Sequence, residues 1–265
     1  MFKFDTPWVQ SPLIPEVQDI LRSIKLVNYK RGSGLATKRL SHLEILYRDW
    51  VKEVINLSEF KFCYFVNGVT DALNQWIATE TREWIYSKGD YEYPKWIGGK
   101  GSIDSNSEDL LYVSNPSCID GNLKDLSNIE NPVILDCAYI GSTSKTKISV
   151  PKNTEQIFFS FSKGWGLVGT RCGLVFTKKP HKSLRLMKKV EGWNYTGVDI
   201  CIKICETFDI DTIYNLYKDR QKPFCDGIDN IEPSDCFYIA NSTSDVYKSR
   251  MRDGKNARLC ISEFL

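Results

Sequence analysis

The sequence is poor in the residues that build metal sites and disulfide scaffolds. It contains only two histidines, His42 and His181, and its nine cysteines include no Cys-x-x-Cys pair. Zinc sites use Cys and His ligands at short, characteristic spacings, so we expect no metal centre. An odd number of scattered cysteines, most of them beside apolar residues, is typical of buried free thiols in a reducing cytoplasm.

Long apolar runs and an excess of either charge are also missing. No apolar run approaches the ~20 residues of a transmembrane helix. Residues 1–16 lack the apolar region of a signal peptide and are interrupted by three prolines. The 35 Lys and Arg residues nearly balance the 33 Asp and Glu residues. We therefore expect a cytoplasmic protein without a membrane or nucleic-acid partner.

The composition is that of a globular protein with a sizeable core. Hydrophobic residues make up 42% of the 265 residues and aromatic residues 12%, which excludes a disordered or low-complexity chain. The length corresponds to one large or two small domains, and no internal repeat or linker is visible.

Short apolar runs in the first two thirds of the chain predict strands that are buried on both faces, as in a parallel sheet. The polar or helical stretches between them indicate crossover helices, one of them over residues 70–86. We therefore expect an α/β fold with a mostly parallel central sheet and flanking helices. The predicted strands are Lys61–Val66, Tyr91–Tyr93, Asp109–Ser114, Val133–Asp136, Gln156–Ser160 and Cys172–Thr177.

The pattern changes after Pro180. Helical periodicity dominates residues 183–190, 198–208 and 213–217, and two later segments resemble strands. These strands, Cys236–Ala240 and Arg258–Ile261, indicate a small α+β C-terminal cap. We predict three parts: an N-terminal arm (1–25), a large domain (26–180) and a small C-terminal domain (181–265).

The segment Ser160-Phe-Ser-Lys-Gly-Trp-Gly-Leu-Val-Gly-Thr-Arg-Cys-Gly173 is the most informative stretch. Its glycines 164, 166 and 169 match the pattern of a dinucleotide-binding fingerprint. Such a fingerprint must follow the first strand, open a helix and precede an acidic residue by roughly 20 positions. Here it follows a late strand and runs directly into another strand, so we do not expect NAD binding.

Lys163 offers a different interpretation of this segment. A lysine at the end of a strand, among small residues, can form a Schiff base with an aldehyde cofactor. Ser160 and Arg171 lie close enough in sequence to converge on a phosphate group. Taken alone, the segment is also compatible with a surface loop that carries a solvated lysine.

Other predicted strands end in residues that suit the same chemistry, because ligands of open α/β sheets bind at the carboxyl ends of strands. Asp136 can keep a pyridine nitrogen protonated, and Tyr139 can donate to a phenolate oxygen. Thr70 opens a helix whose free N–H groups can bind phosphate, although it could simply be a helix cap. Asn115 offers an amide, and Trp96 offers a ring that could either stack on a flat cofactor or pack in the core.

Together these strand ends resemble the fold type I pyridoxal-phosphate (PLP) enzymes, specifically the class I/II aminotransferase family. The Ser-x-Ser-Lys-x-x-Gly-x-x-Gly-x-Arg-x-Gly signature stands complete in residues 160–173, and the resemblance covers residues 60–180 best. It implies that pyridoxal 5'-phosphate is bound as a Schiff base to Lys163. The implied cofactor-binding residues are Val69, Thr70, Trp96, Asn115, Asp136, Tyr139, Ser160, Ser162, Lys163 and Arg171.

Within that set the resemblance assigns individual roles. Lys163, Asp136 and Tyr139 are the implied catalytic residues. Val69 N–H, Thr70, Ser160 and Arg171 are expected to hold the phosphate, and Tyr139 and Asn115 to contact the ring phenolate oxygen. Trp96 is the expected stacking ring, with Tyr93 as the alternative.

The same resemblance implies a substrate carboxylate clamp at Arg258, with Asn115 nearby. A planar fork of donors suits a carboxylate. Arg250 and Arg252 are rival positions, and a surface arginine is the plain alternative. The chain is shorter than usual for the family, mostly after Pro180 and at the N-terminal arm.

The implied activity is transfer of an amino group from an α-amino acid to a 2-oxo acid, both small-molecule substrates, by a homodimer. A PLP-dependent lyase or decarboxylase on the same scaffold is the alternative, and a cofactor-binding regulator without turnover is a third reading. Family members often take a phosphate-contacting tyrosine from the second subunit. Tyr29 and Tyr47 are the candidates for that role.

Overall fold

A computed structural model describes residues 4, 8–26, 28–30, 32–103 and 108–265. Its centre is a six-stranded sheet in the order β1-β6-β5-β4-β3-β2. Strands β2 to β5 are parallel, and β6 lies antiparallel between β1 and β5. This confirms the expected mostly parallel sheet. Its strands are β1 (Phe62–Val66), β2 (Trp84–Tyr86), β3 (Leu110–Ser114), β4 (Val133–Cys137), β5 (Thr154–Ser160) and β6 (Gly173–Thr177).

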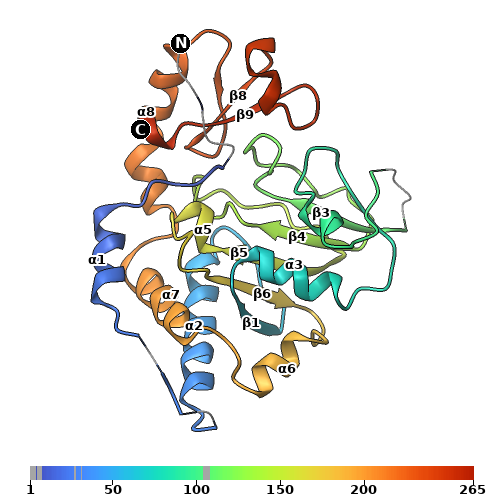
Figure 1. Ribbon diagram of the computed structural model, residues 1–265, viewed down its shortest axis with the longest axis vertical. Helices are drawn as coiled ribbons and strands as arrows, with labels where there is room; N and C mark the ends of the chain where they lie inside the picture. The colour runs from blue at the N-terminus through green and yellow to red at the C-terminus, as the bar shows by residue number, and fades with distance from the viewer. Residues whose placement is uncertain (1–3, 5–7, 27, 31, 104–107) are drawn as a thin grey trace.

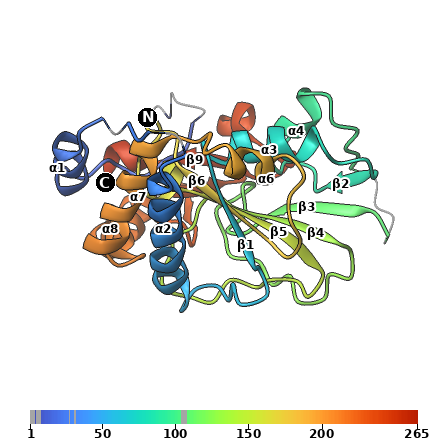
Figure 2. The same ribbon diagram turned by 90° about the horizontal axis from the view of Figure 1, so that it is seen from below.

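Continuous apolar sequence explains why the middle of the sheet is buried on both faces. Every residue of β4 and β6 is buried. Tyr47 of helix α2 packs on Phe159 and Phe176 of the sheet, with ring centroids 5.1 and 5.8 Å away. Helix α3 contacts β1, β5 and β6. Figure 2 shows the sheet between helices and loops.

Helices connect the strands and extend beyond them. Helix α7 packs along α2 and against α1, and α6 packs on β1. The helices are α1 (Pro15–Ser23), α2 (Leu35–Val51), α3 (Val69–Ile77), α4 (Tyr93–Trp96), α5 (Phe161–Gly164), α6 (Leu184–Lys189), α7 (Tyr195–Thr207) and α8 (Thr212–Asp226), with 3₁₀ turns η1 (Asp245–Arg250) and η2 (Ser262–Phe264).

A second, antiparallel sheet forms the C-terminal part of the molecule. Its strands are β7 (Glu232–Pro233), β8 (Ile239–Ser242) and β9 (Ala257–Cys260), in the order β7-β8-β9. Figure 1 shows β8, β9 and α8 beyond the end of the large sheet at which α5 lies. A separate apolar cluster joins this unit to Phe4. The three predicted domain boundaries stay predictions; α6 and α7 pack on the large sheet and its helices.

Two predicted elements near the middle of the chain are wrong. The helix expected over 70–86 ends at Ile77, and Trp84–Tyr86 forms β2, because these three apolar residues are buried in register with β3. The strand expected at Tyr91–Tyr93 is absent. Helix α4 begins there instead, with Pro94 in its first turn, where a proline costs no hydrogen bond.

The predicted C-terminal helices and strands are present, but their first and last residues differ from the prediction. Strand β8 begins at Ile239 rather than at residue 236, and α8 runs from Thr212 to Asp226 through Pro223. Helix α1 lies within the predicted arm. No helix in the described part of the chain is long and apolar enough to cross a membrane.

Candidate active site

The candidate site lies where the parallel strands of the large sheet end. Lys163 sits in α5, directly after β5, and Asp136 lies in β4, in register with Phe158 of β5. Gly164 is required there, because a Cβ would collide with the carbonyl oxygen of Ile140 in the turn after β4. The N-terminal segment crosses the same point, where Ser11 N–H donates to the Lys163 carbonyl at 2.8 Å.

Lys163 has the electrostatic surroundings of a nucleophilic amine. Burial is the main cause that lowers the pKa of its ammonium group, and the cations Arg258 and Arg171 lower it further. A lowered pKa increases the fraction of neutral amine, which is the form that attacks a carbonyl. The same effect shows that Lys163, Arg171 and Arg258 gather around one space.

Asp136 is the opposite case, a buried carboxyl group among these cations. Its Oδ2 accepts a hydrogen bond from Tyr112 Oη at 2.6 Å, and its Oδ1 accepts one from Ala138 N–H at 2.8 Å. Its pKa is raised to about 7, mainly by burial and also by Asp90, although the hydrogen bond from Tyr112 and the charge of Lys163 act against that rise. No cation forms an ion pair with Asp136 within the described residues, so a bound cation such as a protonated pyridine would fit it.

An anion cradle lies at the start of α3, after β1. The chain turns at Gly68 (φ +80°), and the N–H groups of Val69 and Thr70 make no hydrogen bond to any residue that the structure describes. Arg171 lies over this turn, since a Cβ on Gly68 would be 3.0 Å from its Nη2. Free N–H groups, the positive end of a helix and a guanidinium together favour a phosphate.

The two serines of the signature differ in their hydrogen bonds. Ser160 caps α5, and its Oγ accepts from Ser162 N–H at 3.0 Å, which leaves its own hydrogen free to donate to an anion. Ser162 Oγ instead donates to the Leu167 carbonyl at 3.3 Å. Its side chain therefore holds the glycine-rich turn.

Arg258 meets the site from β9, in the C-terminal sheet. Its Nη1 donates to Tyr139 Oη at 3.0 Å, to Cys118 Sγ at 3.2 Å and to the Cys118 carbonyl. Its Nε and Nη2 make no hydrogen bond to the described part of the chain. One side of the guanidinium is thus fixed by protein, and the other side can bind a carboxylate.

Asn115 is brought to this region but its amide is already used. Its Nδ2 donates to the carbonyls of Lys124 (3.0 Å) and Ser149 (3.4 Å), and its Oδ1 accepts from Lys124 N–H. An amide nitrogen has only two hydrogens to donate. The expected contact of Asn115 with a ring oxygen or substrate is therefore corrected: Cys118, three residues on, contacts Tyr139 and Arg258.

Trp96 is also placed apart from the other site residues. Its side chain is 76% exposed at the end of α4. The aromatic ring beside the site is that of Tyr91. Burial is the main cause that raises its pKa, and the nearby Asp136 and Cys118 raise it further. The alternative candidate, Tyr93, stacks on the outer side of Tyr91 at 6.0 Å.

The alternative residues for the carboxylate clamp and for the second-subunit contact lie at other positions. Arg252 donates to the carbonyls of Gly89 (2.8 Å) and Asp90 (3.1 Å), directly before Tyr91 in the chain, and Arg250 donates to the Phe4 carbonyl. Tyr47 is 1% exposed among core aromatics, so it cannot reach a second subunit. The Tyr29 hydroxyl lies 3.5 Å from Asp199.

Solved structures identify the fold of this chain, whereas comparisons of its sequence find no match. No protein-family model matches the sequence, and neither does any curated protein. Histidinol-phosphate aminotransferase from Sinorhizobium meliloti, solved with pyridoxal-5'-phosphate, matches 95% of this chain and 84% of its own, with a TM-score of 0.69 and 14% identity. AspB aminotransferase from Helicobacter pylori matches 97% of this chain and 87% of its own, with the same score and identity.

L-threonine-O-3-phosphate decarboxylase from Porphyromonas gingivalis matches as well, over 97% of this chain and 95% of its own length, with a TM-score of 0.62 and 15% identity. The chain therefore has the fold of the fold type I PLP-dependent enzymes, as the resemblance implied. Because this fold carries more than one reaction, the activity has to be argued from the site.

Proposed function

We propose that this protein is a PLP-dependent enzyme, an aminotransferase that moves an amino group between an α-amino acid and a 2-oxo acid. One observation carries the proposal: Asp136, a buried carboxyl group that forms no ion pair with the residues the structure describes, lies beside Lys163, whose amine has a lowered pKa. Such a pair suits a cofactor with a cationic ring nitrogen and an aldehyde carbon.

The surrounding groups fit the rest of that cofactor. Val69 N–H, Thr70, Ser160 and Arg171 would bind its phosphate, and Tyr91 would stack on its ring. Tyr139, fixed by Arg258, would donate to the phenolate oxygen. The bound cofactor supplies an electron sink for bonds at the substrate Cα.

The chain's own groups would then handle charge and protons. Asp136 holds the positive charge of the ring nitrogen in place. Lys163 would take a proton from the substrate Cα and return it elsewhere, because burial and the neighbouring arginines lower the pKa of its amine. Arg258 would orient the substrate by gripping its α-carboxylate with Nε and Nη2.

A decarboxylase or lyase is the second candidate. It is favoured by the match to a decarboxylase over nearly that enzyme's full length. The same residues would bind the cofactor in both cases, and the orientation of the substrate decides which bond breaks. We also propose a homodimer, as the resemblance implies, which light scattering of the purified protein tests. The scattered free thiols support a cytoplasmic location.

The test is a substrate screen on protein saturated with pyridoxal 5'-phosphate. A transaminase gives spectral changes with an amino acid that reverse on addition of a 2-oxo acid. Release of CO₂ or of another fragment without a 2-oxo acid identifies the alternative. If borohydride attaches no cofactor to the protein, both candidates are wrong.

A further inference from the structure

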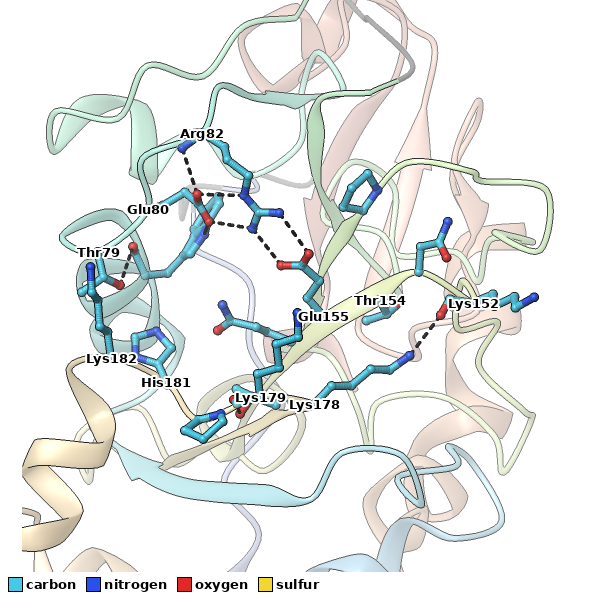
Figure 3. Close-up of a pocket in the computed structure, with 16 residues that line it drawn as sticks. Thr79, Glu80, Arg82, Lys152, Thr154, Glu155, Lys178, Lys179, His181 and Lys182 are labelled. Atoms are coloured by element: carbon cyan, nitrogen blue, oxygen red, sulfur yellow. Dashed lines mark hydrogen bonds and ion pairs between the residues drawn. The ribbon is translucent and has the colours of Figure 1, made fainter.

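A second cavity lies at the opposite edge of the large sheet, where β4 and β5 begin and β6 ends. It encloses about 660 Å³, a size typical of small-molecule sites. Figure 3 shows its lining: Arg82 and Glu155 lie together, Lys179 lies below Glu155 in this view, and His181 and Lys182, which also follow β6, lie to the left. None of these residues belongs to the candidate active site.

Cations dominate this cavity. Five cationic side chains line it, against two carboxylates, Glu80 and Glu155. Both carboxylates are bound by one residue: Arg82 donates to Glu80 at 2.9 and 3.0 Å and to Glu155 at 2.7 and 3.0 Å. One guanidinium offsets one of these two negative charges, so five cations against two carboxylates leave the lining with a net charge of about +3.

The lysines, by contrast, are largely uncompensated. Lys178 pairs with Glu59, which is outside the cavity lining, at 2.7 Å. Lys152, Lys179 and Lys182 form no ion pair with any described carboxylate. The Lys152 side chain points away from the other lining residues in Figure 3, so Lys179 and Lys182 are the two lysines left to create a local positive potential that attracts small anions.

His181 adds a neutral donor to the same wall. Its ring is buried, and burial lowers its pKa to about 4. Leu184 N–H donates to its Nδ1 at 3.4 Å, which places the ring hydrogen on Nε2.

We propose that this cavity binds a small phosphorylated anion, with Lys179 and Lys182 gripping the phosphate oxygens. A phosphate presents several acceptor oxygens and up to two charges, which matches two lysine donors around one hollow better than a single carboxylate does. The ligand is either a free phosphate compound or a phosphate ester such as a nucleotide.

The test uses protein saturated with pyridoxal 5'-phosphate, so that the cradle at Gly68 is already filled. Calorimetric titrations with pyrophosphate and with ATP, at two ionic strengths, measure binding of the two kinds of source. We expect saturable binding of at least one probe, weakened by salt. Tighter binding of ATP identifies an ester ligand, and equal or tighter binding of pyrophosphate identifies a free phosphate compound.

A matched pair of double variants locates the site. Lys179→Ala/Lys182→Ala should weaken binding about tenfold, since two charge-assisted contacts are lost at a solvated site. Lys38→Ala/Lys218→Ala removes the same charge from exposed positions on α2 and α8 and should change affinity less than about twofold. All four positions are exposed, so both variants should fold. Equal losses in the two variants, or no binding of either probe, overturn the proposal.

Discussion

Lys163 and Lys152 flank the same strand, β5, at its two ends. Lys163 is partly buried, and its pKa is lowered by burial and by two arginines; Lys152 is exposed on the opposite edge of the sheet. Asp136 and His181 show a related contrast, because burial raises the pKa of one and lowers that of the other. At the carboxyl edge, burial changes the pKa values of Lys163 and Asp136, as catalytic groups require. At the other edge, exposed lysines such as Lys179 are available to bind a ligand.

The largest expected effect concerns the two lysines that flank β5. Lys163→Ala should abolish borohydride-fixed cofactor and reduce turnover at least about a thousandfold, because no other lysine replaces the missing amine. Lys152→Ala is the matched control and should leave both unchanged. Peptide mapping after borohydride treatment and steady-state kinetics measure these outcomes. Labelling of another lysine in the wild-type protein would remove Lys163 from its proposed role.

The next effect concerns Arg258. Arg258→Ala should lower kcat/KM for amino acids by about a hundred- to ten-thousandfold, because a carboxylate loses two charge-assisted donors. Amines without a carboxylate should be affected much less, although the variant also releases Tyr139 from its hydrogen bond at 3.0 Å. Kinetics with matched amino-acid and amine donors check this. Equal losses for both donors would mean that Arg258 only positions Tyr139.

Opposite pH dependences should distinguish the two edges in the cofactor-free protein. The folded-state pKa of Asp136 is raised from 3.8 to about 7, so its contribution to stability is lost as pH rises between those values, by up to roughly 4 kcal/mol. The folded-state pKa of His181 is lowered from 6.5 to about 4, so its contribution is lost as pH falls through that window, by up to roughly 3 kcal/mol.

Substitutions of Asp136 and of His181 should therefore change the pH dependence of the free energy of unfolding in opposite directions. Between pH 4.5 and 6.5, roughly the range where both groups titrate, Asp136→Asn should become relatively more stable as pH rises, and His181→Gln relatively less stable. Urea unfolding across this range measures the difference between the two variants, in which groups common to both cancel. Parallel profiles would show that one of the two groups is solvated.

The smallest effect is expected at the connection between the C-terminal unit and the large sheet. Arg252→Ala removes hydrogen bonds to Gly89 and Asp90, so it should cost about 1–3 kcal/mol and loosen Tyr91. Cofactor affinity should fall with it. Lys255→Ala, an exposed residue of the same unit, should change neither quantity in denaturation and cofactor-titration experiments. Unchanged cofactor affinity in Arg252→Ala would separate Tyr91 from cofactor binding.

Much of the fold and part of the site followed from local sequence. Apolar runs predicted the strands β1, β3, β4, β5 and β6, since burial on both faces needs continuous apolar residues. Asp136 near the end of β4 and Lys163 just after β5 are close together because parallel strands end at one edge. Spacing could not show which aromatic of Gly-Asp-Tyr-Glu-Tyr-Pro-Lys-Trp faces the site, because α4 turns Trp96 outward.

The sequence by itself therefore determined the sheet and the order of polar groups along its carboxyl edge, since both depend on residues close in the chain. Tertiary structure alone decided that Cys118, not Asn115, meets Tyr139 and Arg258, because the Lys124 backbone takes up the Asn115 amide. It also gathered the lysines of the second cavity. They come from segments that the sheet order places side by side, and no local pattern records that proximity.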